Sequence, residues 1–445
     1  MKLSLLAALA ALFVFGISHQ APVQADAGCV TAKTWIDPAN GHSAYGDGSH
    51  DDWQNLEDML NYAFAHNDAV KLEGGNYRIT KTLVLALAHP SDQLTGFRIS
   101  GINGPQANGQ TNGVSLVLDS QSATQPAVLE IGQGAFYQTI IENIGLKSAV
   151  PNFGTKYGLL FAEQEFSNCS VRNTNVQNVG TAFAIVAGTT GGGNGEDVTL
   201  DHCDGGGNKG YYFNNCGQAL YHHIINCQAG GNNGATAIEV GSGNLGFDLD
   251  ITGFSYTFGT GPLQNTFVQN DGVSGCVNIK GGRLEWCDTL LTYSGGSTNL
   301  TGSVEMRGID VSAMNLYVSN NQWVAKTFPL VDDTLLGTRI QNTGQYTNTF
   351  SNCLISGSSG PVYPALSLTS VTGDYCKNYF EKCVFRGFSN KLTDTSGTPS
   401  VFWTSGSSST PVSNQAALTA IGGIIRDCRT TTGPTYAGSV LVNMP

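Results

Sequence analysis

Two aspartates lie one residue apart in the segment Phe247 to Gly253, which reads FDLDITG. Only 12% of the chain is charged, against about 25% in an ordinary soluble domain. If the segment is a strand, Asp248 and Asp250 point to one side of the sheet and Leu249 to the other. Carboxyl groups that share a face suit acid–base chemistry, because crowding raises the pKa of one group and leaves it a proton to donate.

A recurring apolar residue predicts which other side chains share this face. The intervals are 24, 25, 35 and 25 residues along the inward anchors Leu200, Ile224, Leu249, Leu284 and Ile309. On this alignment the external face carries Asp201, His223, Asp248, Asp250, Arg283, Glu285 and Asp310. Rungs of parallel strands stack about 4.8 Å apart, and residues i and i+2 of one strand lie about 7 Å apart. The sequence therefore predicts one external cluster of carboxylates.

The predicted cluster fits the hydrolysis of a glycosidic bond. Retaining glycosidases hold two carboxyl groups about 5–5.5 Å apart, and inverting ones about 6.5–9.5 Å. Asp250 with Glu285 fits the shorter spacing, and Asp248 with either of them fits the longer. We expect Glu285 to be the general acid and Asp248 or Asp250 the base or nucleophile. The expected substrate-binding residues are His223, Arg283, Asp201, Asp310 and Lys280.

The same residues leave two other functions open. In a polysaccharide lyase, Asp248, Asp250 and Glu285 would hold Ca²⁺ through oxygen ligands. The proton beside a uronate carboxylate would then be abstracted by Arg283, Lys280 or His223. Alternatively, the protein is a non-catalytic surface module that only binds glycan. The cluster itself could also be only a solvated polar face or a structural Ca²⁺ site. For the hydrolase, neither a cofactor nor a metal is expected.

Composition and charge indicate the class of protein and its location. The chain of 445 residues has a formal net charge of −12 and only 21 Lys and Arg, so it lacks the basic face that nucleic acid requires. Residues 1–25 combine Lys2, an apolar run and small residues before Ala25, which predicts a secretory signal peptide. We expect the mature chain, 26–445, to be extracellular or periplasmic. No later segment is long and apolar enough to cross a membrane, so neither nucleic acid nor a membrane is an expected partner.

One amphipathic helix is expected near the start. Helical spacing of apolar residues is found for Leu56, Met59, Leu60, Ala63 and Phe64, which predicts a helix from about Trp53 to His66 with Asp51 or Asp52 as its N-cap. After residue 70, abundant Gly, Asn, Thr and Ser indicate strands and turns. The apolar stripe of the helix must therefore cover β structure.

The residues around this helix resemble the N-terminal signature of the pectate-lyase-like superfamily. The order is Gly46-Asp47-Gly48, then Asp51-Asp52, the helix, and a strand that ends in Gly75-Asn76-Tyr77-Arg78-Ile79. The usual proline before the last segment is replaced by Glu73-Gly74. The resemblance implies a right-handed parallel β-helix whose open end is plugged by the helix. It also implies a polysaccharide hydrolase, a lyase or a tailspike depolymerase, the last of which would be a homotrimer rather than a monomer.

Cysteines support a repeating coil independently. A pattern of one apolar residue, two variable residues and cysteine ends at Cys169, Cys203, Cys227, Cys287, Cys353, Cys383 and Cys428. Such recurrence predicts stacked interior positions, and rung spacing leaves a Cys203–Cys227 disulfide open. Asn168, Asn226 and Asn352 precede three of the cysteines and predict one asparagine ladder at a turn. Together the patterns predict an all-β, single-domain parallel β-helix over 26–445 with an N-terminal capping α-helix.

Overall fold

The computed structural model describes residues 28 to 431 with breaks, of which the longer are 106–112, 120–124, 150–155, 187–193, 259–264, 294–302, 319–325, 357–365, 369–376 and 387–422. The predicted signal peptide, residues 1–25, lies outside the described residues, as do Cys287, Cys383 and Cys428. Within the described ranges, no helix has both the length and the apolar character needed to span a bilayer.

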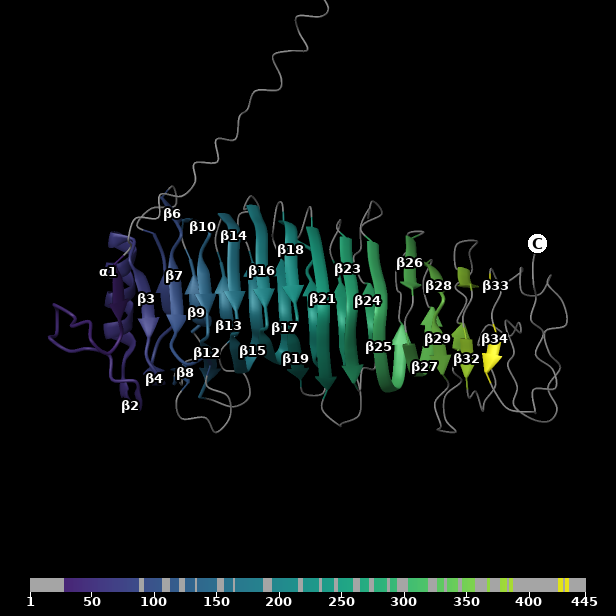
Figure 1. Ribbon diagram of the computed structural model, residues 1–445, viewed down its shortest axis with the longest axis horizontal. Coiled ribbons are helices and arrows are strands. Elements are labelled where there is room, and N and C mark those ends of the chain that lie inside the picture. Colours follow the sequence, from purple (N-terminus) through teal and green to yellow (C-terminus); the bar gives the residue numbers. More distant parts are fainter. Residues whose placement is uncertain are drawn as a thin grey trace, which may run out of the picture.

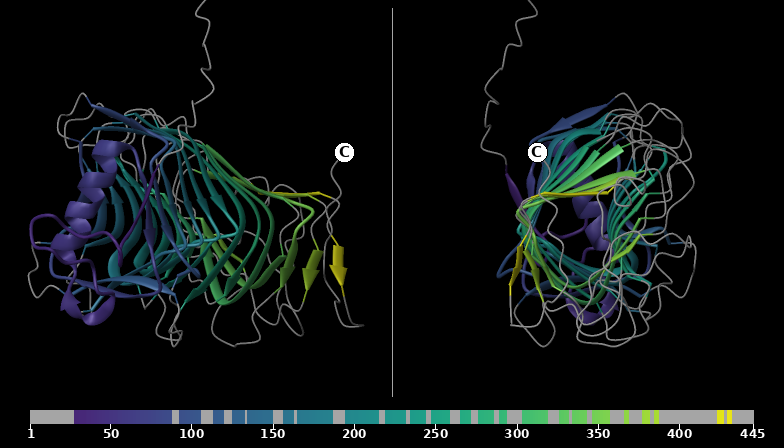
Figure 2. Two further views of the ribbon diagram at one scale, coloured as in Figure 1. Left: turned by 60° about the vertical axis from the view of Figure 1, so that its left-hand side comes forward. Right: turned by 90° about the vertical axis from the view of Figure 1, so that its right-hand side faces the viewer.

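The chain coils into an elongated stack of parallel strands (Figure 1). The 34 described strands form one continuous ladder, because long strands such as β21 (Phe247–Phe258) and β23 (Cys276–Glu285) run from one face of the coil to the next. Seen along the axis, the strands surround a common interior (Figure 2). The predicted all-β fold, a parallel β-helix, is confirmed.

The first face of the coil stacks one strand or part-strand per turn. In order it contains β1 (Cys29–Thr31), β3 (Ala69–Leu72), β7 (Arg98–Gly101), β11 (Ile140–Glu142), β14 (Glu165–Arg172), β16 (Asn194–Asp201), β18 (Ala219–Ile225), the starts of β21, β23 and β25 (Ser303–Val318), β26 (Lys326–Val331), β28 (Tyr346–Ser351), β31 (Lys377–Glu381) and β33 (Gly423–Arg426). Two short strands, β6 (Gln93–Thr95) and β10 (Ala135–Tyr137), extend this face at its leading edge: β6 pairs with β10, and β10 pairs with β14.

The second face follows the first across a sharp bend. It contains β2 (Asp47–Asp51), β4 (Gly75–Ile79), β8 (Val114–Leu118), β12 (Gly145–Ser148), the starts of β15 (Asn175–Val186) and β17 (Asp204–Asn214), β19 (Gln228–Gly231), later parts of β21, β23 and β25, the start of β27 (Thr334–Asn342), β29 (Leu354–Ser356), β32 (Val384–Arg386) and β34 (Arg429–Thr431).

The third face closes each turn. It contains β5 (Leu83–Leu85), β9 (Ala127–Ile131), β13 (Tyr157–Phe161), the ends of β15 and β17, β20 (Thr236–Val240), β22 (Thr266–Asn270), β24 (Thr289–Tyr293), the ends of β25 and β27, and β30 (Leu366–Leu368).

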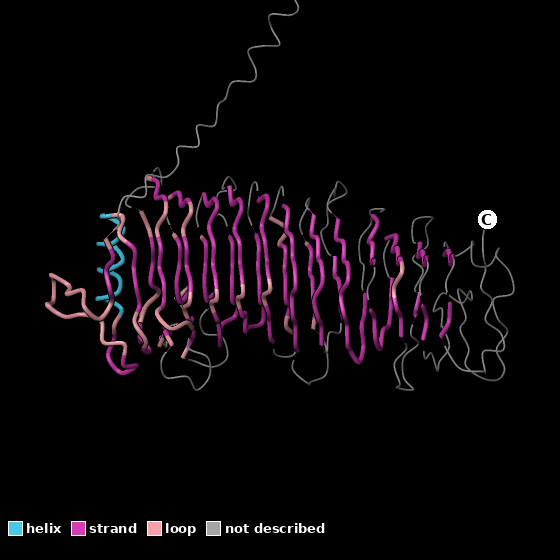
Figure 3. Tube along the Cα trace, viewed as in Figure 1, coloured by secondary structure: helices cyan, strands magenta, loops and turns pink. Residues whose placement is uncertain are grey.

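The predicted helix plugs one end of the coil. Helix α1 (Trp53–His66) lies across the N-terminal end of the stack (Figure 3). It buries Leu56, Met59, Leu60 and Ala63, and the Phe64 ring meets the Phe97 ring edge-on at 4.6 Å between centroids. Without this cover the first turn would expose its apolar interior to water. The predicted capping helix is therefore confirmed.

Asp52 precedes the helix but does not cap it with its side chain. Its carboxylate instead accepts hydrogen bonds from the backbone N–H groups of Tyr45, at 2.6 Å, and Gly46, at 3.0 Å. Burial raises the pKa of Asp52, against the opposing effect of these two bonds. Gly46 has φ +63, and a Cβ there would lie 3.0 Å from the Tyr77 ring. The glycine and the aspartate therefore fold the entry loop against the first turn.

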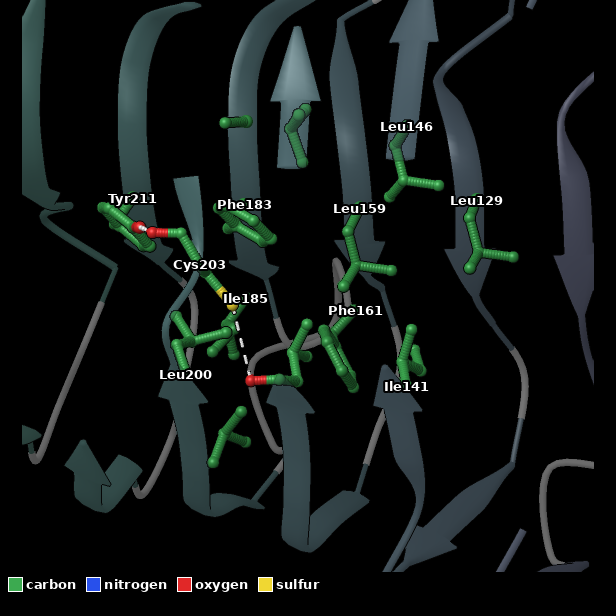
Figure 4. Packing of buried hydrophobic residues seen from close by; sticks show 14 of the residues in the cluster. Leu129, Ile141, Leu146, Leu159, Phe161, Phe183, Ile185, Leu200, Cys203 and Tyr211 are labelled. Atoms are coloured by element: carbon green, nitrogen blue, oxygen red, sulfur yellow. Dashed lines mark hydrogen bonds between the residues drawn. The ribbon is translucent and has the colours of Figure 1, made fainter. Parts of the chain in front are cut away.

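Interior side chains stack in columns along each face. On the third face Leu129, Leu159, Phe183 and Tyr211 follow one another from turn to turn (Figure 4). The Phe183 and Tyr211 rings are stacked at 5.2 Å with an interplanar angle of 9°. Each interior residue contacts copies of its own position above and below, so an apolar repeat in the sequence becomes a continuous core.

The described cysteines of the repeat occupy the interior, as predicted. Cys169, Cys203, Cys227 and Cys353 are each at most 1% exposed. Cys203 and Cys227 are not joined by a disulfide; the Cys203 backbone N–H points at the Cys227 sulfur, 3.3 Å away. At these positions sulfur acts as a small apolar side chain.

Two separate bends, rather than one, carry the asparagines before these cysteines. The bend between the first and second faces holds left-handed residues on successive turns, with φ between 44° and 68°, at Asn143, Asn173, His202, Asn226, Gly253 and Gly281. Asn173 donates an amide hydrogen bond to Asn143 at 2.7 Å. Asn168 instead belongs to an earlier bend within the first face. The prediction of one asparagine ladder is therefore wrong for Asn168. The sequence pattern did not separate the two bends, because each of them places a buried cysteine after a left-handed residue.

Candidate functional site

The candidate site lies on the outer side of the first face, over β18, β21 and β23. Phe247, Leu249 and Ile251 are at most 3% exposed and point into the coil. The intervening Asp248 and Asp250 are partly exposed on the outer side. Alternation along a strand therefore places both carboxylates outside on one face, as the sequence predicts.

Register between turns adds two polar side chains to this pair. His223 of β18, Asp250 of β21 and Asn278 of β23 are partners on successive turns. The Asn278 amide donates a hydrogen bond to the Asp250 carboxylate at 2.9 Å, which fixes the orientation of that carboxylate. Asp248 is two residues away along β21, or about 7 Å along the strand. We call Asp248, Asp250, His223 and Asn278 the first-face cluster.

Asp248 holds its proton more tightly than an ordinary aspartate. Its partial burial raises the pKa of its carboxyl group, and the negative charge of Asp250 raises it further. A positive charge on His223 acts in the opposite direction. Two neighbouring carboxylates thus differ in environment, which is the condition for one to act as an acid and the other as a base.

Three predicted residues lie on the second face instead. Ser255 pairs with Arg283, Thr257 with Glu285, and Arg283 with Asp310. The prediction that Glu285 lies one rung from Asp250 is therefore wrong, as is the single external cluster that included Arg283 and Asp310.

The error comes from the anchor chosen in β21 and β23. Ile224 stacks on Ile251, and Ile251 stacks on Ile279, so the true intervals are 27 and 28 residues. Leu284 stacks on Tyr256, beyond the bend. Both Leu249 and Ile251 are interior, so the alternating pattern alone did not distinguish them.

Asp201 and Lys280 lie on the first face, in the next outward column. This column runs Asp201, Ile225, Thr252, Lys280 and Arg307. Asp201 contacts the exposed ring of His202, with Nδ1 to Oδ1 at 2.6 Å. Lys280 is exposed and lies two residues beyond the Asn278 position. These two predicted side chains are thus beside the first-face cluster rather than within it.

His222 points inward, beneath the cluster. Its ring packs against the rings of Phe213, at 5.3 Å, and Phe247, at 5.8 Å, which also contact each other. Its Nδ1 accepts a hydrogen bond from the Val198 backbone N–H at 3.3 Å. Burial lowers the pKa of His222 to about 3, and the charge of His223 contributes in the same direction. His222 is therefore a neutral core residue.

Tyrosines near the site divide between the interior and the surface. Tyr211 and Tyr256 are at most 1% exposed and belong to the core. Tyr212 is on the outer side of the third face, where the Lys209 ammonium lies 4.7 Å from its ring centroid. Tyr221 of β18 is 63% exposed. Of these four, only Tyr221 offers an exposed ring on the first face.

Sequence reasoning missed Asn278. A signal for Asn278 was present, because FDLDITG and CVNIKGG share apolar residues two apart followed by glycine, at a spacing of 28 residues. Aligning Gly253 with Gly281 would have placed Asn278 beside Asp250.

The predicted Ca²⁺ ligands do not form one set. Register places Glu285 on the second face, apart from Asp248 and Asp250 on the first. Among the residues whose placement is described, no group of three or more His, Cys, Asp or Glu could hold a metal ion. The combination of Asp248, Asp250 and Glu285 as calcium ligands is therefore not supported.

Known proteins resemble this chain in structure but not detectably in sequence. No protein-family model and no curated protein sequence matches it. A cysteine-to-alanine mutant of DFA-IIIase from Arthrobacter chlorophenolicus A6, solved in complex with DFA-III, is similar over 84% of this chain and 88% of its own, with 10% identity and a TM-score of 0.50.

Two phage proteins are similar at lower TM-scores. Pre-mature gene product 12 of bacteriophage phi29 matches 80% of this chain with 11% identity and a TM-score of 0.49, and this chain spans only 52% of its length. The Dettilon tailspike protein matches 79% of this chain and 68% of its own, with 11% identity and a TM-score of 0.41. The structural likeness confirms the right-handed parallel β-helix that the superfamily resemblance implied. At these identities the likeness extends to the fold alone.

Proposed function

We propose that this protein is a glycoside hydrolase that degrades a polysaccharide at the first-face cluster. The observation that carries the proposal is the pair Asp248 and Asp250, two outward carboxylates of one strand in different environments. The fold adds general support, since DFA-IIIase, which shares it, was solved with a bound ligand, DFA-III.

The proposed reaction uses Asp248 as the general acid and Asp250 as the general base. Asp248 donates its proton to the glycosidic oxygen as the bond to the anomeric carbon breaks. Asp250 removes a proton from a water molecule, whose oxygen forms the new bond to that carbon. A separation of about 7 Å along the strand falls within the range of inverting glycosidases, about 6.5–9.5 Å. We therefore expect inversion of configuration at the anomeric carbon. In this mechanism the general acid is Asp248 and not Glu285.

The neighbouring side chains have supporting roles in this proposal. Asn278 holds the Asp250 carboxylate through its 2.9 Å hydrogen bond. His223, the partner of Asp250 on the preceding turn, is positioned to bind a substrate hydroxyl group. Lys280 and Asp201 lie one column further along the face and would contact a neighbouring sugar unit.

The test is an activity panel on the mature chain, residues 26–445. Dextran, soluble starch, xylan, β-glucan, polygalacturonate and alginate are incubated with Ca²⁺ or a chelator, and reducing ends and ultraviolet absorbance are followed together. New reducing ends without absorbance are expected. A parallel rise in both signals would instead show β-elimination, with Lys280 or His223 as the base. Binding without any product would show a non-catalytic glycan-binding protein.

Two variants test the residue assignment. Asp248→Asn and Asp250→Asn should each lower turnover by about 10²–10⁴-fold, the usual contribution of a general acid or base. Asp271→Asn is the matched control, because Asp271 follows β22 on the third face and accepts a 2.6 Å hydrogen bond from Gln269. Full activity of Asp248→Asn would refute the assignment.

We further propose that the chain acts outside the cytoplasm after removal of residues 1–25. N-terminal sequencing of the exported chain should begin at Asp26. Sedimentation of the same sample decides between a monomer and a homotrimer, and a stable monomer would show that one chain contains the whole site.

A further inference from the structure

A bend within the first face places one residue per turn in the left-handed conformation. Its members, with φ between 54° and 80°, are Gly96, Gln138, Asn168, Asp197 and Tyr221. These residues stack on one another from turn to turn in this order. The backbone N–H of Gly96 donates to the Tyr137 carbonyl, and that of Gln138 donates to the Ser167 carbonyl. Strands β14 and β16 pair on both sides of Asn168. The bend is therefore a fixed feature of the coil, which any residue at these positions must accommodate.

Tyr221 is unlike the other members of this bend. Glycine adopts positive φ freely, and Asn and Asp are several-fold enriched there, whereas for a bulky residue the conformation is an outlier. An aromatic ring could offset the strain by packing, but Tyr221 is 63% exposed. The fold alone would favour a small polar residue. Strain of this kind typically persists at functional sites.

The position of Tyr221 connects this strain to the first-face cluster. Between Ala219 and His222 the register of β18 against β21 shifts, so that two residues of β18, Leu220 and Tyr221, lie opposite the single residue Asp248. The two strands are neighbours near the middle of the stack (Figure 1). Tyr221, whose side chain is exposed, is therefore next to Asp248 in the register of neighbouring turns, on the strand that also supplies His223.

We infer that Tyr221 is a sugar-binding residue whose ring packs against the apolar C–H face of a saccharide unit held beside Asp248. An aromatic side chain gives a large rigid contact surface with a polar hydroxyl at its edge, and exposed tyrosines are frequent anchors of binding sites. The ligand class is a saccharide with one unsubstituted ring face. The inference depends on the proposed function only for the claim that the bound unit is next to the cleaved bond.

The experiment measures binding and stability separately. Wild type, Tyr221→Asn and Tyr221→Phe are run in native gels cast with each of the six polysaccharides of the panel. In the gel that retards wild type, Tyr221→Asn should lose roughly tenfold in affinity, and Tyr221→Phe should retain most of it. Because Asn relieves the left-handed strain, Tyr221→Asn should also raise the thermal unfolding midpoint by about 1–2 °C. A structural role for Tyr221 predicts the opposite change in stability.

Gln138→Asn is the matched control, since it also introduces Asn at a left-handed position of the same bend, three turns away from Tyr221. It should not alter affinity. Equal affinity of wild type and Tyr221→Asn, or retardation of wild type by none of the gels, would overturn the inference. Tyr221-dependent retardation without any cleavage would support the inference and refute the hydrolase.

Discussion

His222 should make the stability of the coil sensitive to acid. The side chain is fully buried against two phenylalanine rings, and its pKa is lowered to about 3. In the unfolded chain a histidine titrates near pH 6.5. A lowered pKa means that the folded state binds the proton more weakly than the unfolded state. Its contribution to stability is thus complete above about pH 6.5 and is lost as the pH falls towards 3.

The expected loss can be calculated from these two values. Each pH unit between them is worth about 1.4 kcal/mol. At pH 4.5, two units below the unfolded value, the unfolded state gains about 2.7 kcal/mol from this one group. The full interval, down to about 3, corresponds to about 5 kcal/mol, which is a large part of the stability of an ordinary domain.

The perturbation is His222→Gln, which removes the titrating group and retains an acceptor for the Val198 N–H. Urea unfolding of both proteins is followed by circular dichroism at pH 7.5 and pH 4.5. The loss of unfolding free energy between the two pH values should be smaller in the variant by about 2–3 kcal/mol. His42→Gln, an exposed histidine in the entry loop, is the control. Equal pH dependence in wild type and His222→Gln would refute the reasoning.

Three further changes test the site and the fold. His223→Gln removes the positive charge that opposes the raised pKa of Asp248, so the alkaline limb of the pH–rate profile should move to higher pH; a move to lower pH would contradict the proposed acid. Asp52→Ala leaves one part-buried and one buried backbone N–H group without their acceptor and should cost about 1–3 kcal/mol in chemical unfolding. Unchanged stability would show that water replaces the carboxylate. Gly253→Ala places a Cβ 2.6 Å from an amide oxygen at a position with φ +68 and should destabilise the coil. Its control, Gly281→Asn, has φ +61 and no neighbouring atom within 4 Å, so it should change the thermal midpoint little. Equal effects of the two variants would show that the contact is unimportant.

The fold was predictable because its signals are local. Helix α1 was predicted from Trp53 to His66 by the spacing of its apolar residues, and the structure has these bounds. The glycine and aspartate motif before it is a sequence pattern because its contacts are short-range: Asp52 binds the backbone of residues only six or seven positions away. Interior cysteines were recognisable because the same short pattern, a buried cysteine after a left-handed residue, recurs on several turns.

The composition of the site was less predictable, because register between turns is a non-local property. Alternation correctly placed Asp248 and Asp250 outside, since both flank an interior residue. It did not determine which residue of the next turn lies beside them, because shifting the alignment by two residues keeps every side chain on its side of the sheet. The anchor taken for the next turn, Leu284, lies seven residues beyond Val277, the true partner of Leu249, and on the far side of the bend. Glu285 was therefore assigned to the wrong face, and Asn278 was missed.

Two unfavourable features coincide on the first face. Partial burial raises the pKa of Asp248, and repulsion by the neighbouring Asp250 raises it further. Tyr221, on the neighbouring turn, holds an exposed aromatic ring in a left-handed backbone conformation. Neither feature helps to form the coil, whose stability comes from interior columns that outward residues do not join. Outward positions can therefore be substituted without loss of the core. Two destabilising residues at adjacent positions, Asp248 and Tyr221, are best explained by one ligand that both contact. A double substitution, Asp248→Asn with Tyr221→Asn, should therefore give a folded protein that is more stable than wild type, binds the polysaccharide more weakly and cleaves it far more slowly.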